Sequence, residues 1–149
     1  MAKIRAGFAA IRALRAAGVT KLFGLMGSST LEMDDALYDF KNMQYVGVRH
    51  ENCGIHLADA YGRVMRTPGV SIAGEAGPGA ANMVLGLAQA KLAYSPVVVI
   101  TGLPSTEHLG RDTSQEIDQN TLFLPVSKRT FNVPRPARIP ENSSWKRFA

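Results

Sequence analysis

Apolar positions along this chain follow two periods, one typical of helices and one typical of strands, and the two alternate. Between Ile4 and Arg15 the apolar residues recur at helical spacing, and Gly18 supplies the glycine that often follows a helix end. Short apolar runs predict strands at 19–25, 45–48, 70–73 and 96–101. Helical spacing and capping residues predict the intervening helices at 28–40, 51–66 and 80–92. Strands that alternate with helices predict an α/β domain with a mostly parallel sheet.

Two of these segments also carry a prediction about burial. The strand predicted at 96–101 contains four consecutive apolar residues, which indicates a strand buried on both faces of its sheet. The helix predicted at 51–66 carries one apolar stripe, as an amphipathic helix does on the side that meets the core. This stripe is formed by Cys53, Leu57, Tyr61 and Val64.

The regular pattern weakens after Gly102. Residues 103–120 read as a long polar loop, and loops of that length in compact domains are usually functional or disordered. Residues 128–133 predict one further strand, after which three closely spaced prolines impose extended geometry. We assign residues 1–133 to a single domain and residues 134–149 to a basic, proline-containing tail.

Length and cysteine content narrow the class of protein. The 149 residues are enough for one domain with its own core. Cys53 is the single cysteine, so no internal disulfide can form, and no Cys/His cluster of the kind that builds a zinc site is present in the sequence. Arg12 and Arg15 interrupt the apolar positions near the N-terminus, so neither a signal peptide nor a membrane span is predicted. We expect a cytoplasmic protein without a metal site of its own.

The net charge of +5 comes entirely from the end of the chain. Residues 1–124 carry eleven Lys/Arg and eleven Asp/Glu, whereas residues 125–149 carry six Lys/Arg against Glu141 alone. A basic tail with aromatic residues between its charges is one way to bind nucleic acid. Charge runs are more often solvated than bound, so a nucleic-acid partner is the less favoured interpretation.

Candidate chemistry lies at two consecutive junctions between a strand and the helix that follows it. Glu51 begins a predicted helix, where the partial positive charge of the helix start favours an acid by about 0.3–1 kcal/mol, and this position alone requires no function. His50 beside it lacks an orienting carboxylate and is interpreted as structural. At the next junction, Gly77-Pro78-Gly79 allows close backbone approach, although its spacing matches neither a dinucleotide nor a P-loop motif.

Taken together, however, these residues and several others occur in a familiar order. The motifs are Phe23-Gly24-Leu25-Met26-Gly27, Arg49-His50-Glu51, Ala58-Asp59-Ala60-Tyr61-Gly62-Arg63, Gly77-Pro78-Gly79 with Asn82, Ser95-Pro96-Val97-Val98, and Gln115-Glu116-Ile117-Asp118. In this order and spacing the chain resembles the pyrimidine-binding (PYR) domain of thiamine-diphosphate enzymes, in their acetolactate synthase-like branch. The resemblance covers about residues 4–141 and implies a three-layer, flavodoxin-like α/β fold that lacks the family's last strand.

The resemblance also implies roles for individual residues. Glu51 corresponds to the catalytic carboxylate that meets N1′ of the cofactor's aminopyrimidine and so prepares thiamine diphosphate to attack a keto carbon. Met26, Pro78 and Asn82 correspond to positions that line the pyrimidine pocket, and Gln115 to a polar residue near the reacting centre. These four residues and Glu51 are the predicted cofactor-binding set.

The chain also departs from the family pattern. Met26 stands where a proline is frequent, and Glu75 precedes the glycine-rich turn where small or hydroxyl residues are common. A second carboxylate near Glu51 would compete with it for a proton or leave a buried charge without a partner.

The family's diphosphate and Mg²⁺ are held by a separate PP domain through a GDG motif, and this sequence contains no GDG. We therefore expect a subunit or fragment of a 2-keto-acid decarboxylase or carboligase that is inactive alone. It would share thiamine diphosphate with a homodimer partner or a PP-domain subunit, which would also hold Mg²⁺. The alternative is a non-catalytic remnant that acts as a dimerisation or regulatory module, and a small anion-binding or nucleic-acid-binding domain ranks below both.

Overall fold

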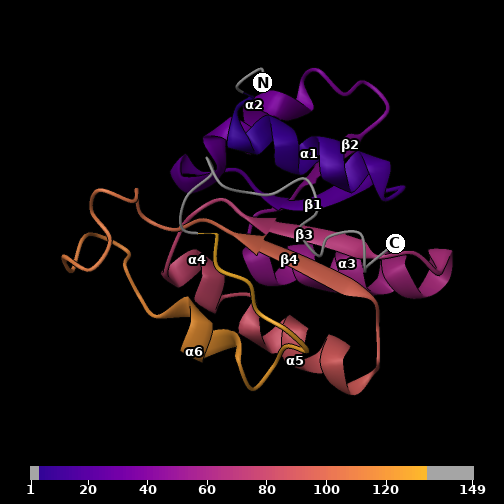
Figure 1. Cartoon of the computed structure of the whole chain (residues 1–149). Helices are drawn as coiled ribbons and strands as arrows, with labels where there is room; N and C mark the ends of the chain where they lie inside the picture. The colour runs from indigo at the N-terminus through magenta and orange to yellow at the C-terminus, as the bar shows by residue number, and fades with distance from the viewer. Residues whose placement is uncertain (1–3, 134–149) are drawn as a thin grey trace.

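The computed structural model describes residues 4–133 and forms a parallel sheet covered by helices on both faces (Figure 1). The strands are β1 (Lys21–Leu25), β2 (Gln44–Gly47), β3 (Gly69–Ala73) and β4 (Val97–Thr101), in the order β2-β1-β3-β4. All neighbouring strands pair in parallel. The helices are α1 (Ala6–Ala16), α2 (Leu31–Leu37), α3 (Glu51–Met65), α4 (Pro78–Ala81), α5 (Val84–Leu92) and α6 (Gln119–Phe123), with a 3-10 turn η1 (Ser28–Thr30). The predicted α/β class with a parallel sheet is confirmed.

Two apolar clusters hold the three layers together, one on each face of the sheet. On one face α1 and α2 pack on the strands through Ile11, Leu37 and Val70. On the other face α3, α5 and α6 meet through Ile55, Met83, Leu87 and Phe123, together with Ala73 of β3. The central strand β3 is buried at every position because helices cover both of its faces.

Small residues let α3 lie unusually close to the sheet. A Cβ atom on Gly54 would come within 3.0 Å of the Ser71 hydroxyl oxygen and 3.2 Å of the Gly24 Cα. A Cβ atom on Gly24 would itself lie 2.2 Å from the carbonyl oxygen of Ile72. These close approaches leave no room for side chains, so they fix the height of the first turns of α3 above β1 and β3.

The apolar stripe predicted to face the core is exposed at three of its four residues, and the prediction is wrong for these three, whereas Tyr61 is half-buried and packs on Phe23. Leu57 is 41% exposed and Val64 is 80% exposed, and Cys53 is also exposed. The buried face of α3 combines Ile55 with small residues, among them Ala58 and Gly62, which let the helix backbone run close to the sheet. Helical periodicity identified a stripe but did not identify the side that packs.

Three other predicted elements differ from the structure. The helix predicted at 80–92 is divided into α4 and α5 between Ala81 and Val84. Strand β4 is half-buried rather than buried on both faces, because it forms an edge of the sheet within the described part of the chain. Residues 128–133 contain no strand.

The tail at 134–149 lies outside the described residues, and so do the three prolines that define it. Within residues 4–133, no helix is both long enough and apolar enough to cross a membrane.

Candidate functional site

Glu51 is the first residue of α3, directly after the β2–α3 junction. His50 is the N-cap of this helix, in extended conformation, and its Nδ1 accepts a hydrogen bond from the Asn52 backbone amide at 3.2 Å. This bond satisfies one of the amides that a helix start leaves unpaired. The imidazole of His50 therefore has a structural role in capping, in agreement with its interpretation from the sequence.

The Glu51 side chain is buried, with 6% of the residue exposed, and it bonds to a residue from the next junction. Asn82, which follows α4, donates from Nδ2 to Glu51 Oε2 at 2.9 Å. Two predicted site residues that are 31 positions apart in the sequence are thus in direct contact. The contact forms because parallel strands deliver successive helix starts to the same edge of the sheet.

The glycine-rich turn packs its backbone against one oxygen of the Glu51 carboxylate. A Cβ atom on Gly79 would lie 3.1 Å from Glu51 Oε1, so any larger residue would crowd this oxygen. Gly77 has a φ of +52°, and a Cβ there would lie 2.2 Å from the Gln115 carbonyl oxygen. The turn thus needs glycine at both positions, because a side chain would crowd Glu51 at Gly79 and the backbone of Gln115 at Gly77.

The other predicted site residues surround this edge without touching Glu51. Met26 directly follows β1 and is 53% exposed. Pro78 begins α4 and is exposed beside Gly79. Gln115 lies in the loop after β4 with a φ of +65°, its backbone packed against Gly77 and its side chain exposed.

Glu75 does not create the conflict expected from the sequence. Its Oε1 accepts a hydrogen bond from the Ser28 backbone amide at 2.7 Å, and its Oε2 accepts one from the Ser28 hydroxyl at 3.0 Å. The carboxylate is only partly buried, and both of its oxygens are bonded, so it is not a buried charge without a partner. Nothing in the local sequence pattern connects Ser28 to Glu75, which lies 47 positions away.

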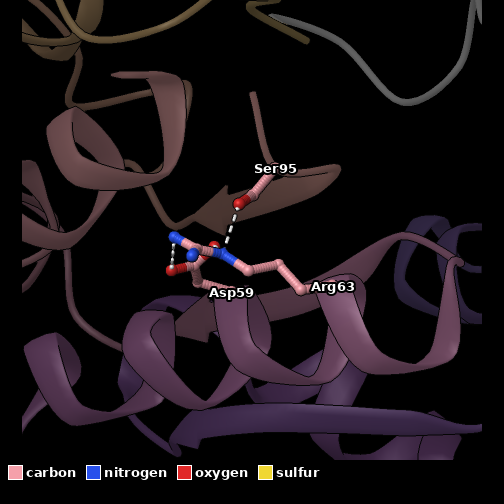
Figure 2. Close-up of polar contacts among 3 residues, drawn as sticks. All are labelled: Asp59, Arg63 and Ser95. Atoms are coloured by element: carbon pink, nitrogen blue, oxygen red, sulfur yellow. Dashed lines mark hydrogen bonds and ion pairs between the residues drawn. The ribbon is translucent and has the colours of Figure 1, made fainter. Parts of the chain in front are cut away.

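A second buried carboxylate on the same helix has a very different environment (Figure 2). Asp59 is 4% exposed and forms an ion pair with Arg63 at 3.0 Å, and Arg63 Nε also donates to the Ser95 hydroxyl at 2.9 Å. Burial acts most strongly and raises the pKa of Asp59, but the hydrogen bonds from Ser95 and Arg63, with the charges of Arg63 and His56, hold that pKa below its ordinary value. The cluster ties α3 to the segment that leads into β4.

No cation is paired with Glu51 in the described part of the chain. The ion pairs among residues 4–133 join Arg5 to Asp35 and Arg63 to Asp59. Over the same residues no group of three or more His, Cys, Asp or Glu side chains could hold a metal ion. The site is therefore a buried carboxyl group without a paired cation among these residues, bonded to one neutral amide and lying against the backbone of Gly79.

Several acetolactate synthases are similar to this chain. It is 41% identical over 133 residues to the probable acetolactate synthase large subunit of Methanocaldococcus jannaschii, covering 89% of this chain and 22% of that protein. It is 39% identical over 141 residues to the acetolactate synthase of Arthrospira platensis, covering 93% of this chain and 24% of that protein. It is 36% identical over 131 residues to the acetolactate synthase isozyme 3 large subunit of Escherichia coli, covering 88% of this chain and 23% of that protein. The chain thus spans about a quarter of the length of these relatives.

A family model describes most of the chain directly. The model for the thiamine pyrophosphate enzyme N-terminal TPP binding domain matches residues 4–122, a range that contains every predicted site residue. Its range also contains all four strands of the sheet and the glycine-rich turn beside Glu51. The chain belongs to the thiamine pyrophosphate enzyme family, as its N-terminal TPP binding domain.

Proposed function

We propose that this chain is the pyrimidine-binding part of a thiamine-diphosphate-dependent 2-keto-acid decarboxylase or carboligase. The observation that carries the proposal is the environment of Glu51, which is buried, has no paired cation among the described residues and receives a hydrogen bond from the neutral amide of Asn82. A carboxyl group with these properties can exchange a proton with a bound heterocycle without separating a strong ion pair. The acetolactate synthases among the relatives support a 2-keto acid as substrate.

Each residue at this edge has a separate task in the proposed site. Thiamine diphosphate, when bound, supplies the carbon nucleophile that attacks the keto carbon. Glu51 holds or releases the proton at N1′ of the aminopyrimidine, while Asn82 fixes Glu51 Oε2 and so determines which oxygen faces the ring. Gly79 keeps side-chain atoms away from Glu51 Oε1, and Met26 and Pro78 form the apolar surroundings of the ring at the edge of the sheet. Gln115, in the loop packed against Gly77, lies on the side of the substrate.

The remainder of the site is proposed to come from another domain. The chain spans 22% to 24% of the relatives named above, so most of such a protein lies outside the matched segment. We propose that a PP domain, in a dimer partner or a separate subunit, binds the diphosphate and its Mg²⁺. Glu51 would then act across the interface between the two domains.

A chimaeric protein tests this function. Residues 1–133 of this chain replace the matching segment of the Arthrospira platensis acetolactate synthase, which supplies the remaining domains. We expect thiamine-diphosphate-dependent turnover of a 2-keto acid, and a loss of about a thousandfold in Glu51→Gln, the size of a typical general acid–base contribution. Glu32→Gln, at an exposed position in α2, is the control and should retain activity. Activity that survives Glu51→Gln would reject the role of Glu51.

The outward stripe of α3 favours a second candidate function. Leu57 and Val64 expose apolar side chains on the helix that begins with Glu51, as a helix does when another protein covers it. A non-catalytic dimerisation or regulatory module would keep this surface and dispense with the cofactor. A folded chimaera without any thiamine-diphosphate-dependent activity would favour this alternative.

A further inference from the structure

Glu75 connects the loop after β3 to the loop after β1, at the edge of the sheet where the proposed site lies. It follows the end of β3, and its Cβ atom would lie 3.3 Å from a Cβ atom placed on Gly79. Both oxygens of its carboxylate accept hydrogen bonds from Ser28, which follows the end of β1. Hydrogen bonds to a charged acceptor are roughly twice as strong as those between neutral groups. Glu75 therefore joins the carboxyl ends of two neighbouring strands through one residue.

The backbone segments on either side of this contact pack closely against each other. A Cβ atom on Gly27 would lie 2.6 Å from the Gly74 carbonyl carbon and 2.8 Å from Glu75 Oε1. The Ser29 amide also donates to the Gly74 carbonyl oxygen at 2.9 Å. Three hydrogen bonds thus connect residues 28–29 to residues 74–75. The backbone that carries Met26, two positions before Ser28, is held against β3 by this set of contacts.

We propose that Glu75 is a positioning residue for the cofactor's pyrimidine ring, an inference that rests on the function proposed above. By binding Ser28 it holds the loop that contains Met26 in the position where the ring meets it. A preformed surface avoids the cost of ordering the loop when the cofactor binds. Loss of Glu75 should therefore weaken cofactor binding more than it slows the chemical step.

The same contact keeps two carboxylates apart. Gly79 separates them, because a Cβ atom there would lie 3.1 Å from Glu51 Oε1 and 3.3 Å from Glu75 Cβ. Like charges at a short distance disfavour each other, so a mobile Glu75 would compete with Glu51 for the same proton. Donors from Ser28 hold the Glu75 carboxylate at the end of β1 instead. The acid at position 75 is thus compatible with a separate role for Glu51.

Amide hydrogen exchange tests the contact itself on the chain without cofactor. In Glu75→Ala the Ser28 amide should exchange about tenfold faster, the size expected for loss of one hydrogen bond to a charged group. The Ser29 amide should change less, since its acceptor is the Gly74 carbonyl. Glu32→Ala is the matched control and should leave both rates unchanged. An unaltered Ser28 rate in Glu75→Ala would overturn the proposal.

Kinetics of the chimaera test the consequence for the cofactor. Glu75→Ala should raise the KM for thiamine diphosphate about tenfold while kcat stays within about threefold. Glu75→Gln keeps an oxygen acceptor for the Ser28 amide and should recover most of the loss, which separates positioning from a general failure to fold. Unchanged KM in Glu75→Ala, or a fall in kcat with KM unchanged, would overturn the proposal. Inactivity of the unsubstituted chimaera would instead contradict the proposed function. The hydrogen-exchange result does not depend on activity, so it would still test the contact between Glu75 and Ser28.

Discussion

The two buried carboxylates of α3, Glu51 and Asp59, have contrasting surroundings on one helix. They are eight positions apart, and their residues are 6% and 4% exposed. Asp59 is paired with Arg63 and its cluster includes the Ser95 hydroxyl, whereas Glu51 receives one hydrogen bond from the neutral amide of Asn82. Burial is therefore similar, and the difference lies in the countercharge.

Under the proposed function, this difference separates a structural acid, Asp59, from a reactive one, Glu51. A guanidinium beside a buried carboxyl group stabilises its anion, and removal of either partner leaves the other without compensation. A neutral donor such as the Asn82 amide orients a carboxyl group without supplying a countercharge. Position on a helix or burial alone would not have distinguished Glu51 from Asp59. The identity of the residues that reach each carboxylate from elsewhere in the chain does.

The largest effect is expected from Glu51→Gln. In the chimaera, activity should fall about a thousandfold, since the amide cannot exchange a proton as the acid does. The free energy of unfolding of the chain should change by less than about 1 kcal/mol, because glutamine keeps an oxygen that accepts the Asn82 bond. Urea unfolding followed by circular dichroism measures the second quantity. A large loss of stability would place Glu51 with Asp59 as a structural acid.

The opposite outcome is expected from Asp59→Asn. The variant loses the ion pair with Arg63 and should be less stable by about 1–3 kcal/mol, with kcat unchanged while the protein remains folded. The matched control is Asp35→Asn, which removes an ion pair whose side chains are 57% and 63% exposed and should cost less than about 1 kcal/mol. Equal losses of stability in the two variants would show that burial of Asp59 is unimportant.

A smaller effect is expected from Asn82→Ala. Without its Nδ2 donor, Glu51 Oε2 is no longer fixed, and we expect kcat in the chimaera to fall about tenfold. Asn120→Ala, at an exposed position in α6, is the control for removal of an asparagine side chain. Full activity in Asn82→Ala would mean that the orientation of Glu51 does not depend on this hydrogen bond.

The smallest expected effect is the pH dependence of the stability that Asp59 contributes. The pKa of Asp59 in the folded chain lies below the ordinary value of 3.8, so its contribution to stability is complete above that value and is lost as the pH falls through the folded pKa. The difference in unfolding free energy between the original chain and Asp59→Asn should thus be constant from about pH 5 to 7 and should shrink below about pH 4. Urea titrations at pH 7 and in the acid range measure it. A difference that grew in acid would contradict the lowered pKa.

Much of the secondary structure could be predicted from the sequence, and so could the positions of Glu51 and the glycine-rich turn within it. Alternating periods located four strands and most of the helices, because burial on a sheet or along a helix imposes its own repeat on the chain. Motif order placed Glu51 at the start of α3 and Gly77-Pro78-Gly79 at the start of α4, as the structure has them. These are local properties, and neighbouring residues suffice to specify them.

Only the tertiary structure decided which side chains meet. The contacts between Glu51 and Asn82 and between Ser28 and Glu75 join residues 31 and 47 positions apart, and no local pattern encodes such pairs. The exposure of Leu57 and Val64 on α3 was likewise decided by packing, because the helix approaches the sheet through Ile55 and its small residues. The sequence thus determined where an acid begins a helix, and the packing of distant segments determined that this acid is buried, oriented and left without a countercharge.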